Sequence, residues 1–147
     1  MYLVDTNVIS SSAPARLAPP RLVRWMEAHS SMLFLSAVTI AEIEDGIAKL
    51  RREGATRKAA ELGAWLETML HLYEERVLAF DMPTARLAGA ISDRARARGH
   101  APGFADIAVA ATAARHELTI LSRNLRHFEP MGVWAVDPFA ELPGARR

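Results

Sequence analysis

The sequence predicts an α/β fold built on a mainly parallel β-sheet. Five short apolar runs, each closed by polar or turn-forming residues, alternate with segments whose apolar residues recur at helical spacing. Strands that alternate with helices in this way pair in parallel, because each helix returns the chain across the sheet. The 147 residues, half of them hydrophobic, suit one core, and we expect a single domain over residues 1–147.

The N-terminal half carries two of the predicted strands. The run at 2–4 is apolar and ends abruptly at Asp5, as a buried strand does. Gly54 is expected to end the long helix after the second strand, and Thr56 to cap the helix after it. In order, the pattern predicts a strand at 2–4, a proline-interrupted loop at 10–20, a helix at 21–29, a strand at 32–35, and helices at 38–52 and 56–74.

The C-terminal half repeats the alternation. Asp81 and Pro83 close the third strand, and Gly99 stops the helix that follows. From Ile107 onward the next helix is apolar nearly all round, which predicts that it is buried. In order, the pattern predicts a strand at 77–80, helices at 84–98 and 104–116, and strands at 118–121 and 133–136.

Composition excludes several classes of function. The chain has no cysteine, and therefore no disulfide, no thiolate zinc site and no cysteine nucleophile. Neither a histidine spacing typical of zinc sites nor a GxxxxGK[ST] or GxGxxG nucleotide loop occurs. The net charge of +1 gives no global basic field. Without a visible secretory signal or an apolar run near the ~20 residues of a membrane span, we expect a cytoplasmic protein that does not enter a membrane.

Polar residues beyond the strand ends are the first candidates for chemistry, because sites in parallel sheets form at the carboxyl edge. That edge is predicted to carry Asp5-Thr6-Asn7, Ser36, Asp81 and Ser122-Arg123-Asn124. Helix capping explains a single Asp at this place about as well as function does, but three capping-type residues in a row exceed what one cap requires. Arg123 would contact a phosphate or hold a carboxylate in place.

Two further acids lie on predicted helices. Glu42 borders the apolar stripe of its helix and has no ion-pair partner one turn away, although a solvated surface charge is the ordinary alternative. Asp106 begins the buried helix, where interaction with the helix dipole, worth ~0.3–1 kcal/mol, is the alternative to a place in a cleft. Gly46 costs ~1 kcal/mol relative to alanine in mid-helix, which a close approach by another segment or by a ligand would explain.

Carboxylates from separate segments raise one another's pKa when they converge, unless a cation intervenes. Oxygen ligands suit a hard divalent ion, so Mg²⁺ or Mn²⁺ is the natural choice. If Asp5, Glu42 and Asp106 meet, we expect them to hold such an ion.

Four blocks, in order and spanning nearly the whole chain, carry a family resemblance: LVDTNVIS at 3–10, LSAVTIAE at 35–42, ADIAVAATA at 105–113 and LSRNLRHF at 121–128. They resemble PIN-domain ribonuclease toxins of the VapC and FitB type. The resemblance implies a three-layer α/β/α domain with a central, mainly parallel five-stranded sheet. It also implies an acidic pocket that binds Mg²⁺, or Mn²⁺ in its place, and cleaves RNA.

The resemblance assigns roles to individual residues. The metal-holding and catalytic acids would be Asp5, Glu42 and Asp106. Asn124 matches a fourth catalytic column, in which members carry Asp or Asn. Support for the site is expected from Asn7, Ser122 and Arg123. His127 stands where many members have Asp, so the site is expected to be one acid poorer, with weaker activity or lower metal affinity.

The resemblance also implies partners. A small antitoxin of the VapB or FitA kind would block the acidic pocket, and the chain would form a homodimer. The wide apolar stripe over 62–73 would serve the dimer, the antitoxin or the ordinary core.

The RNA products would carry a 3′-hydroxyl and a 5′-phosphate.

Two other functions stay open at this point. An aspartyl phosphotransferase would use Asp5 as its nucleophile, although Asn7 replaces the second Asp of that motif and the chain is short for that fold. A non-catalytic module of the same fold would bind RNA or a protein partner without cutting. His127 and Asn124, where acids are common, leave room for that second alternative.

Overall fold

Five parallel strands form one central sheet. The computed structural model describes residues 1–14, 16 and 18–144. The strands lie in the order β3-β2-β1-β4-β5, and every neighbouring pair is parallel. Their bounds are β1 Tyr2–Val4, β2 Leu33–Ser36, β3 Val77–Leu78, β4 Thr119–Leu121 and β5 Ala135–Val136. The predicted α/β class is confirmed, and the sheet is parallel throughout rather than mainly.

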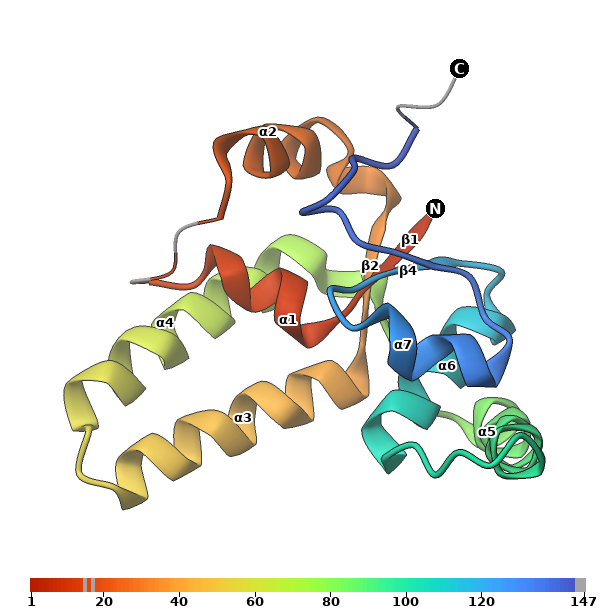
Figure 1. Cartoon of the computed structure of the whole chain (residues 1–147). Coiled ribbons are helices and arrows are strands. Elements are labelled where there is room, and N and C mark those ends of the chain that lie inside the picture. The colour runs from red at the N-terminus through yellow and green to blue at the C-terminus, as the bar shows by residue number, and fades with distance from the viewer. Residues whose placement is uncertain (15, 17, 145–147) are drawn as a thin grey trace.

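Seven α-helices connect and flank these strands in the described part of the chain. They are α1 Thr6–Ile9, α2 Pro20–Ala28, α3 Ala37–Arg52, α4 Thr56–Tyr73, α5 Met82–Ala97, α6 Phe104–Arg115 and α7 Leu125–Phe128. The helices α3 and α4 pack against each other and extend together away from the sheet (Figure 1). The short helices α1 and α7 follow β1 and β4 directly, so both begin at the carboxyl edge of the sheet.

Two apolar clusters on opposite faces of the sheet give the three layers. Neighbouring strand residues separate cleanly: Val4 and Leu121 join the cluster with α1, α2, α3 and α4, whereas Leu3 and Ile120 join the cluster with α5, α6 and α7. All four side chains are completely buried. This alternation is the two-residue period of a strand covered on both faces.

Three predicted boundaries differ from the structure. The third and fifth strands have only two residues each, because both lie at an edge of the sheet and pair on one side only. Thr56 does not cap α4: it is the first helical residue, and the capping position is Ala55, whose side chain has no oxygen to accept a capping hydrogen bond. Gly54 does end α3 as predicted, with a left-handed φ of +80°. None of the described helices has the length and apolar character needed to cross a membrane.

Candidate active site

Asp5 is held at the junction of β1 and α1 by three hydrogen bonds. As the residue that caps α1, it accepts one from the backbone N–H of Thr6 at 2.9 Å. Its other oxygen accepts from the Asn7 side-chain amide at 3.0 Å and from the Ser122 hydroxyl at 2.7 Å. The side chain is only 7% exposed. The capping role that the sequence offered for Asp5 is therefore confirmed, and its functional role stays a prediction.

Burial makes the negative charge of Asp5 unfavourable. Loss of solvation is the largest cause that raises the pKa of Asp5 above 3.8. Hydrogen bonds from Ser122 and Thr6 counter that rise, and the nearby charge of Asp106 adds to it. A cation placed beside Asp5 would remove this electrostatic cost.

Glu42 approaches the same region from α3. Its Oε2 atom accepts a hydrogen bond from the Thr6 hydroxyl at 2.5 Å. Partial burial of the carboxylate raises the pKa of Glu42 above 4.5, the Thr6 hydrogen bond lowers it, and the charges of Asp5 and Asp106 raise it further. The charges of Asp5 and Asp106 therefore act on the Glu42 carboxylate from other elements of the fold.

Asp106 completes the group from the first turn of α6. Its Oδ2 atom is 3.0 Å from Nδ1 of His127 on α7. A neutral histidine with the proton on Nδ1, or a protonated one, would donate this bond; the tautomer follows from the partner, since a carboxylate only accepts. His127 therefore does not simply replace an expected acid, because its ring contacts the carboxylate of Asp106.

A compact hydrogen-bond network joins the ends of β1 and β4 behind these acids. The Ser122 hydroxyl donates to Asp5 and accepts from the Asn7 amide at 3.1 Å and from the backbone N–H of Asn124 at 3.0 Å. The backbone N–H of Arg123 donates to Asn7 Oδ1 at 3.1 Å. One donor and two acceptor sites of the hydroxyl are thus all used, so Ser122 and Asn7 fix the orientation of Asp5.

Two of the predicted residues contribute less through their side chains. The Arg123 guanidinium lies 4.7 Å from the centre of the Phe139 ring and holds no carboxylate of the described residues. The exposed side chain of Asn124 makes no capping hydrogen bond to α7. In this conformation both residues enter the site through their backbone N–H groups.

The remaining polar residues at strand ends are helix caps. Ser36 accepts from the backbone N–H of Val38 at 3.2 Å and starts α3. Asp81 accepts from the backbone N–H and hydroxyl of Thr84 at 3.0 and 2.7 Å, and these bonds lower the pKa of Asp81 below 3.8. Their place at the carboxyl edge predicted a site, but both side chains serve the helices that follow them.

The donor chemistry of the acids fits a hydrated divalent ion. Among the described residues, no three His, Cys, Asp or Glu side chains are grouped closely enough to hold a metal ion unaided. Mg²⁺, however, usually keeps several waters and takes only one or two protein carboxylates. Asp5, Glu42 and Asp106 supply hard oxygen donors whose charges repel one another. Such a donor set suits a cation that keeps its own waters better than one held in a closed protein cage.

Sequence reasoning did not identify two residues of the site. Thr6 links Asp5 to Glu42, since its backbone bonds one and its hydroxyl the other. His127 was noted only as a substitution. The partner of each lies on another element, 36 positions away for Thr6 and 21 for His127. The position of Thr6 between two candidate residues was the one available signal.

The known proteins that are similar to this chain agree on its family. The family model described as PIN domain matches residues 2–131. Toxin FitB of Neisseria gonorrhoeae is 33% identical over 95% of this chain and 99% of its own length. VapC ribonuclease Y4jK of Sinorhizobium fredii is 32% identical over 95% of this chain and 98% of its own length. The crystal structure of FitAcB from N. gonorrhoeae superposes with a TM-score of 0.81 at 35% identity, covering 95% of this chain and 99% of that one.

Proposed function

The chain belongs to the PIN-domain family, and from that premise we propose that it is a Mg²⁺-dependent endoribonuclease, the toxin component of a type II toxin–antitoxin system. One observation supports the proposal: Asp5, Glu42 and Asp106 come from different elements, and the charges of Asp5 and Asp106 raise the pKa of Glu42. No lysine or arginine of the described residues forms an ion pair with them. Such an arrangement is costly unless a cation occupies it, and the cation can then engage a phosphate.

Each residue of the site has a distinct task in phosphodiester hydrolysis. Asp5 and Asp106 would hold the divalent ion, with Glu42 as a further ligand or as the group that positions a water. When bound, the ion supplies Lewis acidity: it acidifies a water and offsets charge on the phosphate oxygens, and Mn²⁺ would serve in place of Mg²⁺.

Neighbouring residues keep those acids in place. Ser122 and Asn7 fix Asp5, and Thr6 holds Glu42. Asn124 would complete the site as a fourth polar residue. Arg123 is exposed beside it and would contact the RNA backbone.

Substitution of the acids tests the proposal. Asp5→Asn and Asp106→Asn should each reduce cleavage of RNA in Mg²⁺ by more than the ~10–100-fold typical of losing an outer partner of a metal ligand. Glu44→Gln, an exposed acid on α3, is the matched control and should cleave normally. Wild-type rates in both aspartate variants, with folding verified by circular dichroism, would contradict the proposal.

The two alternatives are less well supported. An aspartyl phosphotransferase needs a second Asp two residues after its nucleophile, but Asn7 stands there and its side-chain amide donates to Asp5. A module that binds without cutting needs no ion, so it should show little heat in a calorimetric titration with Mn²⁺. The nuclease should bind Mn²⁺, and Asp106→Asn should weaken that binding.

A protein partner and a second copy of the chain complete the proposal. A toxin requires a neutralising partner, and the related solved structures are named FitAcB and FitAB. We expect a small antitoxin of the VapB or FitA kind to suppress both growth arrest and RNA cleavage when the two are co-expressed. Light scattering on the isolated protein should give twice the chain mass of 16.2 kDa if it forms the expected homodimer.

A further inference from the structure

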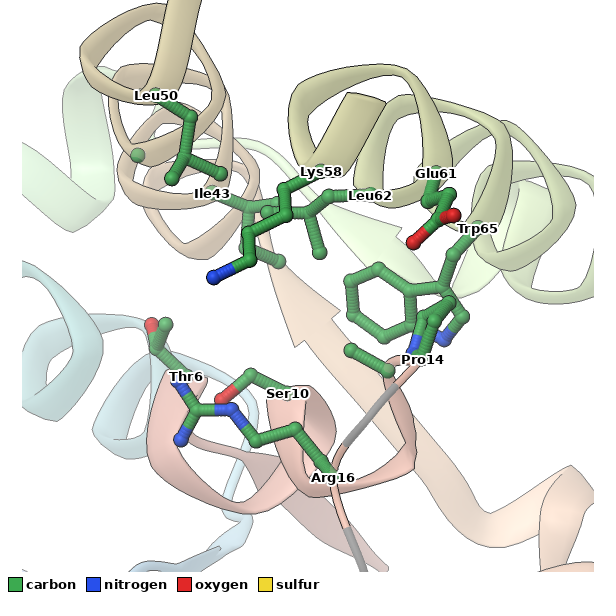
Figure 2. Close-up of a pocket in the computed structure, with 12 residues that line it drawn as sticks. Thr6, Ser10, Pro14, Arg16, Ile43, Leu50, Lys58, Glu61, Leu62 and Trp65 are labelled. Atoms are coloured by element: carbon green, nitrogen blue, oxygen red, sulfur yellow. The ribbon is translucent and has the colours of Figure 1, made fainter. Parts of the chain in front are cut away.

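A pocket beside the acids lies between α1, α3 and α4. Its volume is about 450 Å³, within the range of sites that hold small molecules. Thr6 and Ser10 line one side, and residues of α3 and α4 line the other (Figure 2). Thr6 belongs both to this pocket and, through its hydroxyl, to the acid site. Anything bound in the pocket therefore lies next to the place where RNA would be cut.

Gly46 lines the pocket, and no packing contact of the described residues requires a glycine at this position. A Cβ atom built on this mid-helix glycine would meet no atom within 4 Å. Of the two explanations that the sequence offered, close approach by another segment is therefore excluded for the described residues. Gly63 and Gly89 are similarly free of neighbours but do not line this pocket. The space over Gly46 is left open to an occupant.

The pocket combines a flat apolar wall with positive charge. The indole of Trp65 and the side chains of Ile43 and Leu62 form the apolar side of the pocket (Figure 2). The exposed cations Lys58 and Arg16 also line it, and neither forms an ion pair with a described acid; the one acid of the lining, Glu61, pairs with Arg57. An apolar pocket with an aromatic ring and two such cations matches one nucleotide, whose base packs on the ring and whose phosphate needs positive charge.

We propose that this pocket receives one unpaired base of the RNA, adjacent to the phosphate that the acids engage. The proposal rests on the proposed ribonuclease function and adds a determinant of where RNA is cut. Charge favours RNA over a protein side chain as the occupant, because Lys58 and Arg16 pair with no described acid and would complement phosphate, whereas the acid of the lining, Glu61, is paired with Arg57. Trp65 supplies the stacking face, and Lys58 would contact the phosphate of the same nucleotide.

Gly46→Leu is the decisive variant, because it fills the pocket from within a helix. Leucine is a better helix former than glycine, and open space surrounds the position, so α3 should be preserved. Gly89→Leu is the matched control: it makes the same change at a mid-helix glycine of α5 that also has open space. Thermal unfolding of both variants verifies that they fold.

Binding is measured separately from cleavage. The indole N–H signal of Trp65, assigned with Trp65→Phe, is followed by NMR in EDTA while AMP, GMP, CMP or UMP is added to the full chain. Ribose 5-phosphate is the probe without a base. At least one nucleotide should shift the signal and ribose 5-phosphate should not. Gly46→Leu should weaken that binding about tenfold or more, and Gly89→Leu should leave it unchanged.

Three outcomes would overturn the proposal. Equal shifts with ribose 5-phosphate would mean that charge alone is recognised. A shift with N-acetylleucinamide and with none of the nucleotides would assign the pocket to a protein side chain. Unchanged cleavage sites and rates in Gly46→Leu, with an active wild type in Mg²⁺, would leave the nuclease intact and remove the base pocket. An inactive wild type would instead count against the ribonuclease function, whatever the nucleotides do.

Discussion

At the residue scale, a small number of hydroxyl and amide donors replace the water that would otherwise solvate the acids. Asp5 has lost nearly all contact with solvent, yet Ser122, Asn7 and Thr6 replace the lost hydration with three hydrogen bonds. Glu42 has one such donor, the Thr6 hydroxyl. The orientation of the acids is therefore set before any ion binds, and the remaining cost is mainly loss of solvation, to which repulsion among like charges adds.

The raised pKa of Glu42 predicts how the stability of the metal-free protein depends on pH. The pKa of Glu42 is raised in the folded protein, so the folded state holds its proton to higher pH than the unfolded state does. Stability should therefore fall as the pH rises from about 4.5 through the higher folded pKa. Glu42→Gln removes the charge and keeps an oxygen that accepts from Thr6, so in EDTA the variant should melt at a higher temperature than wild type at pH 7.5.

The difference should shrink as the pH approaches 4.5, where the wild-type carboxyl is also protonated. Glu44→Gln, on the exposed part of the same helix, should show no such pH-dependent gain. A Glu42→Gln protein less stable than wild type at pH 7.5 in EDTA would mean that burial and the neighbouring charges do not make the Glu42 carboxylate unfavourable in the folded protein.

At the element scale, long elements were predictable and very short ones were not. The helices α3, α4, α5 and α6 carry several turns of periodic apolar residues, so their ends were located to within a few positions. The helices α1 and α7 have four residues each, too few to show a helical period. They carry Thr6 and His127, so the two residues missed in the site are on the two helices missed in the fold.

The start of α3 provides the element-scale prediction. Ser36 is fully buried and caps the helix that carries Glu42. Ser36→Ala should lower the free energy of unfolding by about 0.5–2 kcal/mol, the usual effect of removing a capping side chain. Urea denaturation measures the loss. Ser31→Ala, an exposed serine before β2, should change little. Equal stability of Ser36→Ala and wild type would mean that the cap does not stabilise α3.

At the scale of the whole molecule, topology accounts for what the sequence could predict about the site. Parallel strands bring their carboxyl ends to one edge, which is why Asp5 and Ser122 could be expected together although they are far apart in the chain. The hydroxyl of Thr6 reaching Glu42, and His127 reaching Asp106, depend on how α3 and α7 lie against the sheet. The residue types and their spacing in the sequence do not determine how these helices pack against the sheet.

The acids also join the layers of the molecule. Asp5 follows a central strand, Glu42 comes from α3 in one apolar cluster, and Asp106 from α6, which packs in the other. An ion bound by all three would stabilise the folded chain as a whole, because the unfolded chain has no such site. At an Mg²⁺ concentration about 100 times the dissociation constant, the added stability would be about 2.7 kcal/mol.

We therefore expect Mg²⁺ or Mn²⁺ to raise the melting temperature by about 5–10 °C, at roughly 2–4 °C for each kcal/mol in a chain of this size. Asp106→Asn should melt without this response, because it removes the ligand contributed by α6. Its melting temperature in EDTA should be at least that of wild type, since one of three repelling charges is gone. Scanning calorimetry at matched ionic strength, with NaCl replacing the divalent salt, separates binding from screening. A wild type that gains no more from Mg²⁺ or Mn²⁺ than Asp106→Asn does would show that the three acids do not act together on an ion.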